Sequence, residues 1–329
     1  MKRTSHLLRF LAIVLLAACA PLALAAAPAA DFPARPVRWI VPTATGAGTD
    51  YAARLFAQLA SDAWKQSVIV DNRSGASGMI GLEGIANAAP DGYTLGFFSV
   101  SQFIDATLLQ KFVFEAGRDF TPISLLASTP LVLVTNAATN LNTLKALIAA
   151  AKAAPKTLNY SSGGSGGVTH LAMEVMLSKA GIEVVHIPYK GSGPAIVDLL
   201  AGRVQLAIST PPAIMQHVKA GRLNALALAV DARSPVAPDI PTFAEAGLPG
   251  VSLSSWYGLI GPANMPPELV DRIAKTVTTP ARTAAMHDKM ITDGLDPVLG
   301  TPAEFVRFLK AEREQWTTVA RNIGFKRDK

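Results

Sequence analysis

Short apolar runs rich in β-branched residues alternate along this chain with segments whose apolar residues recur every three or four positions. A run of the first kind favours a buried strand, and a segment of the second kind favours a helix with one buried face. Their alternation predicts an α/β fold with mixed, largely parallel sheets. The expected strands are Val37–Val41, Val68–Asp71, Thr94–Phe98, Leu131–Thr135, Leu158–Tyr160, Val184–Pro188, Leu206–Ile208 and Leu226–Val230, and the expected helices between them are Thr49–Trp64, Leu141–Ala154, Thr169–Ala180, Pro194–Ala201 and Pro212–Ala220.

Two interruptions of this pattern indicate a change of domain. A strand-like segment near Ala127 is broken at Ser128–Pro130, and Asp231–Gly250 is rich in proline and lacks periodicity. We expect a discontinuous arrangement, in which residues 31–128 and 251–329 form one lobe and residues 129–250 form the other. One domain with a long loop is the alternative. Beyond the second interruption we expect a strand at Trp256–Gly261 and helices at Pro267–Thr278 and Pro302–Asn322.

The N-terminus has the pattern of an export signal. Basic residues at Lys2, Arg3 and Arg9 flank an apolar run that ends in Ala23-Leu24-Ala25, a small-residue cleavage sequence. This predicts a removable leader over residues 1–25. The sequence that ends at Cys19 also fits a lipoprotein signal, in which this cysteine anchors the protein to a membrane.

Charge and composition narrow the function classes. Removal of the leader takes away three basic residues and no acidic one, so the formal charge falls from +6 to +3. A charge this small does not indicate a nucleic-acid partner. Beyond the leader, no apolar stretch approaches the roughly 20 residues that a membrane span needs. Four histidines lie beyond the leader without metal-ligand spacing, so we expect neither a metal nor a cofactor; they are His170, His186, His217 and His287.

The stretch Pro36–Asp50 has the pattern of a strand, a glycine turn and a helix start. A helix N-terminus presents unpaired backbone N–H groups and the positive end of the helix dipole, which suits an anion. Gly46-Ala47-Gly48 opens like a dinucleotide-binding motif, but Tyr51 occupies the third glycine position and Asp50 adds a negative charge, so a carboxylate is favoured over a nucleotide. A plain glycine turn, with Thr49 or Asp50 capping the helix, is the structural alternative.

A second glycine loop, Gly163–Gly167, also lies between a strand and a helix. Two such loops predict a clamp around an anion. The second loop matches the nucleophile elbow of serine hydrolases as well, with Ser165 as nucleophile and Asp231 or Asp239 with His287 as partners, so a secreted serine hydrolase is an alternative.

Two further loops follow strands. Pro188–Pro194 offers the Tyr189 ring and the cation of Lys190, although a surface lysine beside a proline turn is equally common. Asn72–Gly78 is a turn of the same type. Ligands of open α/β sheets bind outside the carboxyl ends of the strands, so we expect the four loops to converge on one cleft.

Several short strings form a set that spans nearly the whole chain beyond the leader. They are Pro33-x-Arg-Pro-Val-Arg-x-Ile-Val-Pro, Gly46-x-Gly-Thr-Asp, Val70-Asp-Asn-Arg-x-Gly-Ala, Ala88-x-Pro-Asp-Gly-Tyr-Thr-Leu, Tyr160-x-Ser-x-Gly, His170-Leu-Ala, Pro188-Tyr-Lys-Gly, Ala201-Gly-Arg-Val and Pro241-Thr-x-x-Glu-x-Gly. Together they resemble the Bug family of periplasmic solute receptors, which serve tripartite tricarboxylate transporters.

This resemblance implies a type II periplasmic-binding-protein fold, with two lobes that close on a small carboxylate at a hinge cleft and no catalysis. It implies a monomer that delivers its ligand to the large and small membrane subunits of the transporter; a receptor for a two-component sensor kinase is the alternative. The ligand-binding residues then expected are Thr43, Ala44, Thr45, Gly46, Ala47, Gly48, Asp50, Ser77, Ser101, Ser161, Gly163, Gly164, Ser165, Gly166, Thr169, His170, Tyr189, Lys190 and Gly191. Thr43 and Ala47 depart from the aromatic and the glycine usual in the family, so the ligand itself is not carried over.

Overall fold

Six strands form the first sheet, in the order β11-β4-β10-β3-β1-β2. The computed structural model describes residues 32–108 and 118–322, without the side chains of Ser77 and Leu108. Every element below lies in the unit that begins at Pro33. The predicted leader and Cys19 lie outside the described residues. The strands of this sheet are β1 (Val37–Val41), β2 (Val68–Asn72), β3 (Thr94–Ser99), β4 (Phe120–Pro130), β10 (Ser254–Pro262) and β11 (Asp296–Pro297).

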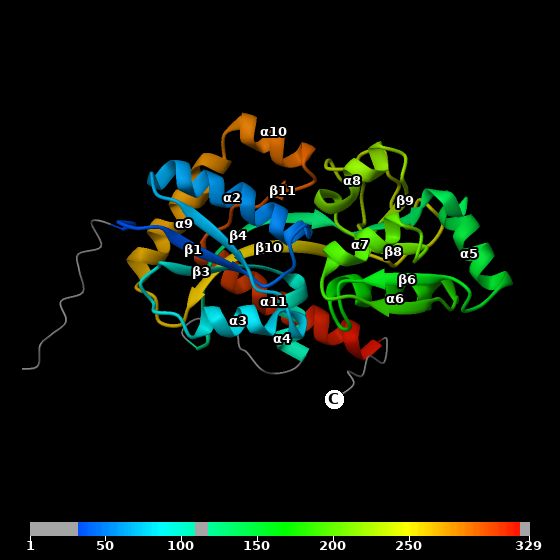
Figure 1. Cartoon of the computed structure of the whole chain (residues 1–329), viewed down its shortest axis with the longest axis horizontal. Helices are drawn as coiled ribbons and strands as arrows, with labels where there is room; N and C mark the ends of the chain where they lie inside the picture. The colour runs from blue at the N-terminus through cyan, green and yellow to red at the C-terminus, as the bar shows by residue number, and fades with distance from the viewer. Residues whose placement is uncertain (1–31, 109–117, 323–329) are drawn as a thin grey trace, which may run out of the picture. The chain divides into compact units, whose positions relative to one another are not determined.

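Helices cover both faces of the first sheet (Figure 1). On one face α2 packs against α9, and on the other α4 packs against α3 and α11. These helices and the short turn before α3 are α2 (Gly48–Trp64), η2 (Ala76–Gly78), α3 (Met79–Ala86), α4 (Val100–Leu108), α9 (Pro267–Ala281), α10 (Ala284–Thr292) and α11 (Pro302–Asn322).

Five strands form the second sheet, in the order β7-β6-β8-β5-β9. Helix α7 packs against β5, β6 and β8, α8 against β9, and α6 against β6 and β8. The elements are β5 (Val132–Asn136), η3 (Ala137–Thr139), α5 (Leu144–Ala153), β6 (Asn159–Ser162), α6 (Val168–Ala180), β7 (Val185–Pro188), α7 (Ser192–Leu200), β8 (Leu206–Ser209), α8 (Pro211–Lys219) and β9 (Leu223–Leu228).

Both sheets are mixed. Parallel pairing joins β2, β1 and β3 in the first sheet and β7, β6 and β8 in the second, where helices connect the strands. The remaining pairs, which involve β4, β5, β9, β10 and β11, are antiparallel. Parallel order is therefore confined to the strands that a helical crossover links, as connection geometry requires.

The chain passes between the sheets at two neighbouring places. Strand β4 ends at Pro130 and β5 begins at Val132, while the return runs through residues 229–253 into β10. Pro130 and Ser254 are directly paired, so the two passages lie side by side. The strand break expected at Ser128–Pro130 is wrong, because β4 runs through it: the Thr129 hydroxyl donates to the Gly294 carbonyl at 2.7 Å, and a proline at a strand end removes few ladder bonds.

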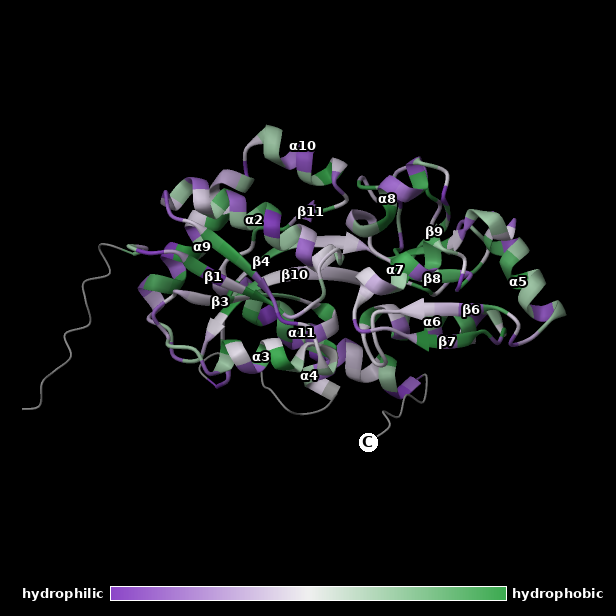
Figure 2. Cartoon of the chain, viewed as in Figure 1, coloured by the Kyte–Doolittle hydropathy of each residue, from purple (hydrophilic) through white to green (hydrophobic). Residues whose placement is uncertain are grey.

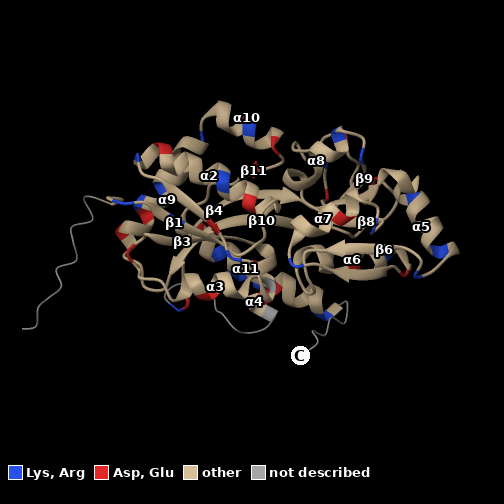
Figure 3. Cartoon of the chain, in the orientation of Figure 1, with Lys and Arg blue, Asp and Glu red and all other residues tan. Residues whose placement is uncertain are grey.

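Alternate residues of β5 belong to two different hydrophobic clusters of the core. Leu131 and Leu133 join a large cluster that also holds residues of the first sheet, whereas Val132 and Val134 point to the opposite face and join the cluster beneath α7 and α8. Hydrophobic residues concentrate on β1 and around β8 (Figure 2). Strands β4, β6, β8 and β10 carry no charged residue, and the charges gather on helices and loops (Figure 3).

Helix ends also follow from sequence. Thr143 caps α5 by accepting the N–H of Ala146 at 3.1 Å. Gly181 ends α6 in the left-handed conformation that glycine adopts without strain. Within the described ranges, no helix has both the length and the apolar character to cross a membrane.

Candidate ligand-binding site

Loops from both sheets border one cavity of about 490 Å³. The first sheet contributes the loops that follow β1 and β2, the last residue of β3 with residues of α4, and two residues of β10. The second sheet contributes the segments that follow β6, β7 and β8. The four loops singled out in the sequence therefore lie around the same cavity, at the carboxyl ends of their strands.

The first loop borders the cavity with part of its length. Thr45 and Gly46 are exposed and do not line the cavity, although the sequence predicted both as ligand contacts. The residues of this loop that line the cavity are Thr43, Ala44, Ala47, Gly48 and Thr49.

Helix α2 starts at this loop without a side-chain cap. Its N-cap residue is Ala47, so neither Thr49 nor Asp50 caps the helix. The first-turn N–H groups therefore keep the capacity to bind an anion. The Thr43 hydroxyl oxygen is buried at the cavity wall and has no hydrogen-bond partner in the described part of the chain.

Asp50 supports the first loop from behind instead of lining the cavity. Its carboxylate accepts the N–H of Gly46 at 3.0 Å and the side-chain amide of Asn72 at 3.0 Å, and it pairs with Arg54 at 3.0 Å. The Asn72 amide also donates to the Thr43 carbonyl at 3.2 Å. Asp50 thus fixes the loop after β1 to the end of β2, and its negative charge is used within the protein.

The second loop presents Gly163, Gly164 and Ser165 to the cavity. Helix α6 follows it with Gly167 as an N-cap that has no side-chain oxygen. The Val168 N–H reaches the Ser101 hydroxyl at 3.4 Å, so Ser101 of α4 joins the two sheets at the cavity.

Thr169 also lines the cavity, while its hydroxyl accepts the N–H of Gly163 at 3.1 Å. Two predicted contacts of this loop do not line the cavity: Ser161 is buried with its hydroxyl toward the Ala195 carbonyl, and Gly166 donates its N–H to Nδ1 of His170 at 3.0 Å.

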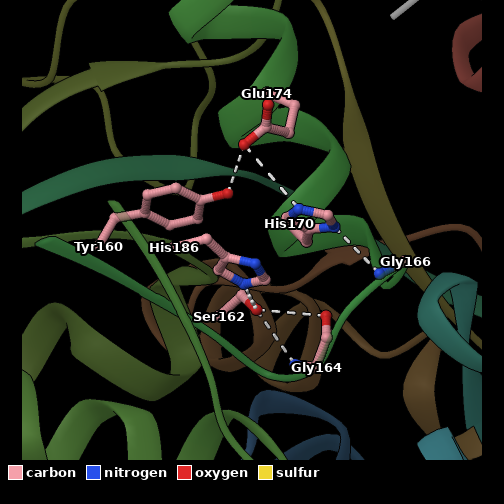
Figure 4. A network of polar contacts seen from close by, with 7 residues as sticks. All are labelled: Tyr160, Ser162, Gly164, Gly166, His170, Glu174 and His186. Carbon is pink, nitrogen blue, oxygen red and sulfur yellow. Dashed lines mark hydrogen bonds and ion pairs between the residues drawn. The ribbon is translucent and has the colours of Figure 1, made fainter. Parts of the chain in front are cut away.

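A partly buried polar network supports the second loop (Figure 4). The rings of His170 and His186 stack with 4.1 Å between their centroids, and His186 stacks in turn on Tyr160 at 4.7 Å. The Ser162 hydroxyl lies 2.6 Å from Nε2 of His186 and receives the Gly164 N–H at 3.2 Å. His170 therefore does not line the cavity, and it positions the loop through Gly166.

Burial sets the charge state of this network. Desolvation lowers the pKa of His170 to about 4, and desolvation together with the neighbouring His170 lowers the pKa of His186 to about 4. Both imidazoles are neutral at pH 7, which leaves Nδ1 of His170 free to accept from Gly166. The Tyr160 hydroxyl donates to Glu174, and burial followed by this carboxylate raises the pKa of Tyr160.

The third loop brings the single basic residue of the cavity lining. Tyr189, Lys190 and Gly191 all border the cavity, and no arginine does so among the described residues. The Tyr189 hydroxyl donates to Asp198 at 2.7 Å and so points to the following helix α7, while Tyr189 still borders the cavity. Gly191 is the N-cap of α7 and lacks a side-chain cap, as in α2 and α6.

The fourth loop contributes Ser74, Gly75, Ala76 and Gly78. Gly75 and Gly78 have φ of +125° and +88°, which glycine tolerates and other residues rarely do. The side chain of Ser77 lies outside the described part of the structure, so its predicted contact stays a prediction.

Several lining residues gave no signal in the sequence. Tyr257 of β10 is 1% exposed, and its hydroxyl lies next to the hydroxyls of Thr210 and Ser255. It makes no hydrogen bond of good geometry within the described residues, and burial raises its pKa so that it stays protonated. Gln102 and Asp105 of α4 also line the cavity. Tyr257 lies inside an apolar strand pattern, and α4 itself was not expected.

The described residues contain no cluster of three or more side chains suited to hold a metal ion. The cavity instead combines backbone N–H groups at helix starts with hydroxyls and one lysine. Such donors recognise an oxyanion through charge-assisted hydrogen bonds.

Comparison with known proteins identifies the family of this chain. Residues 52–325 match the model of the tripartite tricarboxylate transporter family receptor, TctC. The chain belongs to this receptor family. Among relatives of the receptor, BugT of Bordetella pertussis is 36% identical over 297 residues, which cover 90% of this chain and 91% of BugT. The resemblance to Bug proteins seen in the sequence is thereby confirmed.

Solved structures agree with the TctC assignment. A Rhodopseudomonas palustris protein solved with adipate is 31% identical, with a TM-score of 0.82 over 89% of this chain and 98% of the other. MatC of the same organism, solved with bound malate, is 27% identical, with a TM-score of 0.80 over 88% and 99%. The predicted periplasmic-binding-protein fold, with two α/β lobes and mixed sheets, is confirmed.

The TctC family consists of solute receptors, not enzymes. In this receptor Ser165 borders the cavity, but His287, the expected base of a hydrolase triad, does not. His287 lies on α10 with its Nδ1 3.5 Å from Asp288. Asp231 and Asp239 do not line the cavity either. The match to a nucleophile elbow therefore rests on the glycine pattern alone.

Proposed function

We propose that this protein is a periplasmic receptor that captures a small carboxylate-bearing metabolite and delivers it to a tripartite tricarboxylate transporter. The observation that carries this proposal is the cavity bordered by uncapped helix starts from both sheets, among them those of α2, α6 and α7. Each start presents backbone N–H groups and a partial positive charge, which together replace an arginine.

The site residues are proposed on the same geometry. The carboxylate binds to the first turn of α2 and to the second loop, near Gly48 and Gly164, with hydroxyls of Thr43, Ser165 and Tyr257 as further donors. A micromolar ligand needs about 8 kcal/mol of binding free energy, which a few charge-assisted hydrogen bonds in a cavity supply.

Capture occurs by closure of two lobes, which we assign to residues 31–128 with 251–329 and to residues 129–250. Close approaches between the loops support this assignment. A Cβ built on Gly193 would lie 2.5 Å from the Thr45 carbonyl, and one on Gly48 would lie 2.3 Å from the Thr210 hydroxyl. Loops of the two sheets thus approach each other closely beside the cavity.

A thermal-shift screen against a library of mono-, di- and tricarboxylates tests the proposed ligand class. A ligand that binds only the folded protein raises its melting temperature. Calorimetry then measures the affinity of each hit for the wild type and for Gly48→Ala. Absence of any hit, or equal affinities in the two proteins, would contradict a carboxylate site at α2.

Delivery is tested in cells. Uptake of the labelled ligand should require this protein together with the large and small membrane subunits of the transporter. If deletion of those subunits leaves uptake intact but loss of an adjacent sensor kinase abolishes a transcriptional response, the receptor serves signalling instead. Light scattering of the purified protein should give the mass of a monomer.

Export is proposed from the family and from the basic, apolar and small-residue pattern of residues 1–25. Mass spectrometry of the protein purified from the periplasm should give a chain that starts after Ala25. A chain that starts at a lipidated Cys19 and fractionates with membranes would show the lipoprotein route.

A further inference from the structure

The tip of the first loop lies against the start of α7, which belongs to the second sheet. A Cβ built on Gly193 would lie 2.5 Å from the Thr45 carbonyl oxygen, and one built on Gly191 would lie 3.1 Å from the Cβ of Ala44. Neither Gly193 nor Thr45 lines the cavity. The contact between these two residues therefore joins the sheets outside the ligand-binding surface.

Hydrogen bonds hold both sides of this contact in place. In the first loop, the Asp50 carboxylate accepts the N–H of Gly46 at 3.0 Å. On the other side, the Gly191 N–H donates to the Gly163 carbonyl at 3.0 Å, which attaches the start of α7 to the second loop. A local shift of either segment would strain these bonds. An added side-chain atom at Gly193 would therefore hold the first loop and α7 apart.

The geometry of α7 gives a weak reason for glycine at this position. Gly193 is the second residue of the helix, and its φ lies outside the left-handed region that favours glycine. Glycine is also a poorer helix former than alanine. Pro194 offers a local alternative, because a proline disfavours the helical conformation of a preceding residue that carries a Cβ. An experiment on Gly193 therefore has to separate the effect of Pro194 from the contact with Thr45.

We infer that the contact of Gly193 with Thr45 positions the two lobes in the closed state and sets the affinity of the receptor without touching the ligand. The inference rests on the proposed capture by closure and adds the residues through which the lobes meet. When a smaller fraction of the protein can adopt the conformation that holds the ligand, the apparent affinity falls by the same factor for every ligand. Gly193 is thus a positioning residue, unlike Gly48, which lines the cavity.

Calorimetry on the full mature protein tests the inference. The probes are malate and adipate, which the two solved Rhodopseudomonas palustris proteins hold, and each hit from the carboxylate screen. We expect Gly193→Ala to bind every ligand at least about tenfold more weakly than the wild type does, and by the same factor for all of them. A residue that touched the ligand would change the affinities of different ligands by different factors.

Two further variants show whether the loss comes from the contact with Thr45. Pro194→Ala changes an exposed residue of the same helix and should keep the wild-type affinity. In Gly193→Ala with Pro194→Ala, no proline follows the new side chain and both alanines favour the helix, so α7 should fold as in the wild type. We expect this double variant to bind as weakly as Gly193→Ala alone. Melting temperatures without ligand show that each variant is folded.

The outcomes separate the inference from the proposed function. Wild-type affinity in Gly193→Ala overturns the inference and leaves the carboxylate receptor intact. A loss that differs among ligands, or that disappears in the double variant, also overturns it, because the effect then comes from a ligand contact or from the helix. An equal loss for all ligands that persists in the double variant supports it. If no carboxylate binds the wild type, the proposed function fails and the inference fails with it.

Discussion

The imidazole of His170 lies parallel to that of His186, with 4.1 Å between ring centroids and 9° between ring planes. Two cations at this distance would repel each other, and burial makes each charge costly. The stack therefore requires neutral rings. Because Gly166 donates to Nδ1 of His170, the conformation of the second loop depends on the same neutral state.

We predict that stability falls as the pH decreases from 6.5 toward 4. In the unfolded chain each histidine has a pKa of 6.5, whereas burial lowers the pKa of His170 and of His186 to about 4 in the folded protein. Between these values the unfolded chain binds more protons, so the free energy of unfolding decreases with falling pH and is level above 6.5. Glu174 and Tyr160 face the pair, and the carboxylate of Glu174 lies 3.9 Å from Nε2 of His170 without reversing this direction.

Urea denaturation at pH 7, 6 and 5 measures this dependence. His186→Phe keeps a ring in the stack and removes one of the two titrating groups, so the pH dependence should be about half that of the wild type. His287→Gln removes an exposed histidine and should leave it unchanged. An equal slope in the wild type and in His186→Phe would contradict the buried neutral pair.

Gly48→Ala should weaken ligand binding at least about tenfold, because the new Cβ has no space. It would lie 2.3 Å from the Thr210 hydroxyl and 2.7 Å from the Tyr257 hydroxyl, so the loops around the cavity must move apart. Gly300→Ala is the control, since its nearest neighbours would be 3.7 Å away in ordinary contact. Calorimetry with the best ligand from the carboxylate screen compares the three proteins, and wild-type affinity in Gly48→Ala would show that the approach of α2 is not needed.

Asp50→Ala should lower both stability and affinity. The carboxylate holds three donors, from Gly46, Asn72 and Arg54, and its loss leaves the first loop without its link to β2. Hydrogen bonds to a charged group contribute about 2 kcal/mol each, and we expect a loss of stability of that order. Asp62→Ala, an exposed position on the same helix, should stay within about 0.5 kcal/mol of the wild type. If Asp50→Ala weakens binding at unchanged stability, Asp50 contacts the ligand instead of supporting the loop.

The regular α/β part of the fold could be predicted because its signals are local. Strands such as β1 and helices such as α2 bury one face with a clear period, and the glycine loops mark their ends. Strand β4 was not predicted, because Ser128 and Thr129 have the pattern of a strand break. The contact that satisfies the Thr129 hydroxyl comes from the Gly294 carbonyl, which is far along the chain and gives no local signal. Helix α4 follows β3 without a turn residue between them, so no boundary marks it.

The sequence was enough to predict which loops form the candidate site but not which way their side chains point. Gly48 and Gly164 lie at the cavity because a strand end followed by a helix start places them there. Asp50 and His170 lie in the first turns of the helices that follow these loops, yet each accepts a backbone N–H behind the cavity wall. Tyr257 comes from a strand far along the chain, and its place depends on pairing with Ser99, a contact that no local pattern carries.

The side chain before Tyr257 holds the opposite face of β10. Trp256 donates its indole N–H to Glu312 at 2.6 Å, and Trp316 donates to the same oxygen at 2.9 Å, so one buried carboxylate joins β10 to α11. Glu312→Ala leaves two buried indole donors unpaired and should lower the free energy of unfolding by about 3 kcal/mol. Glu314→Ala changes an exposed residue of the same helix and should have little effect. Urea denaturation followed by tryptophan fluorescence compares the two variants, and similar midpoints would show that the indole–carboxylate bonds contribute nothing to the packing behind the cavity.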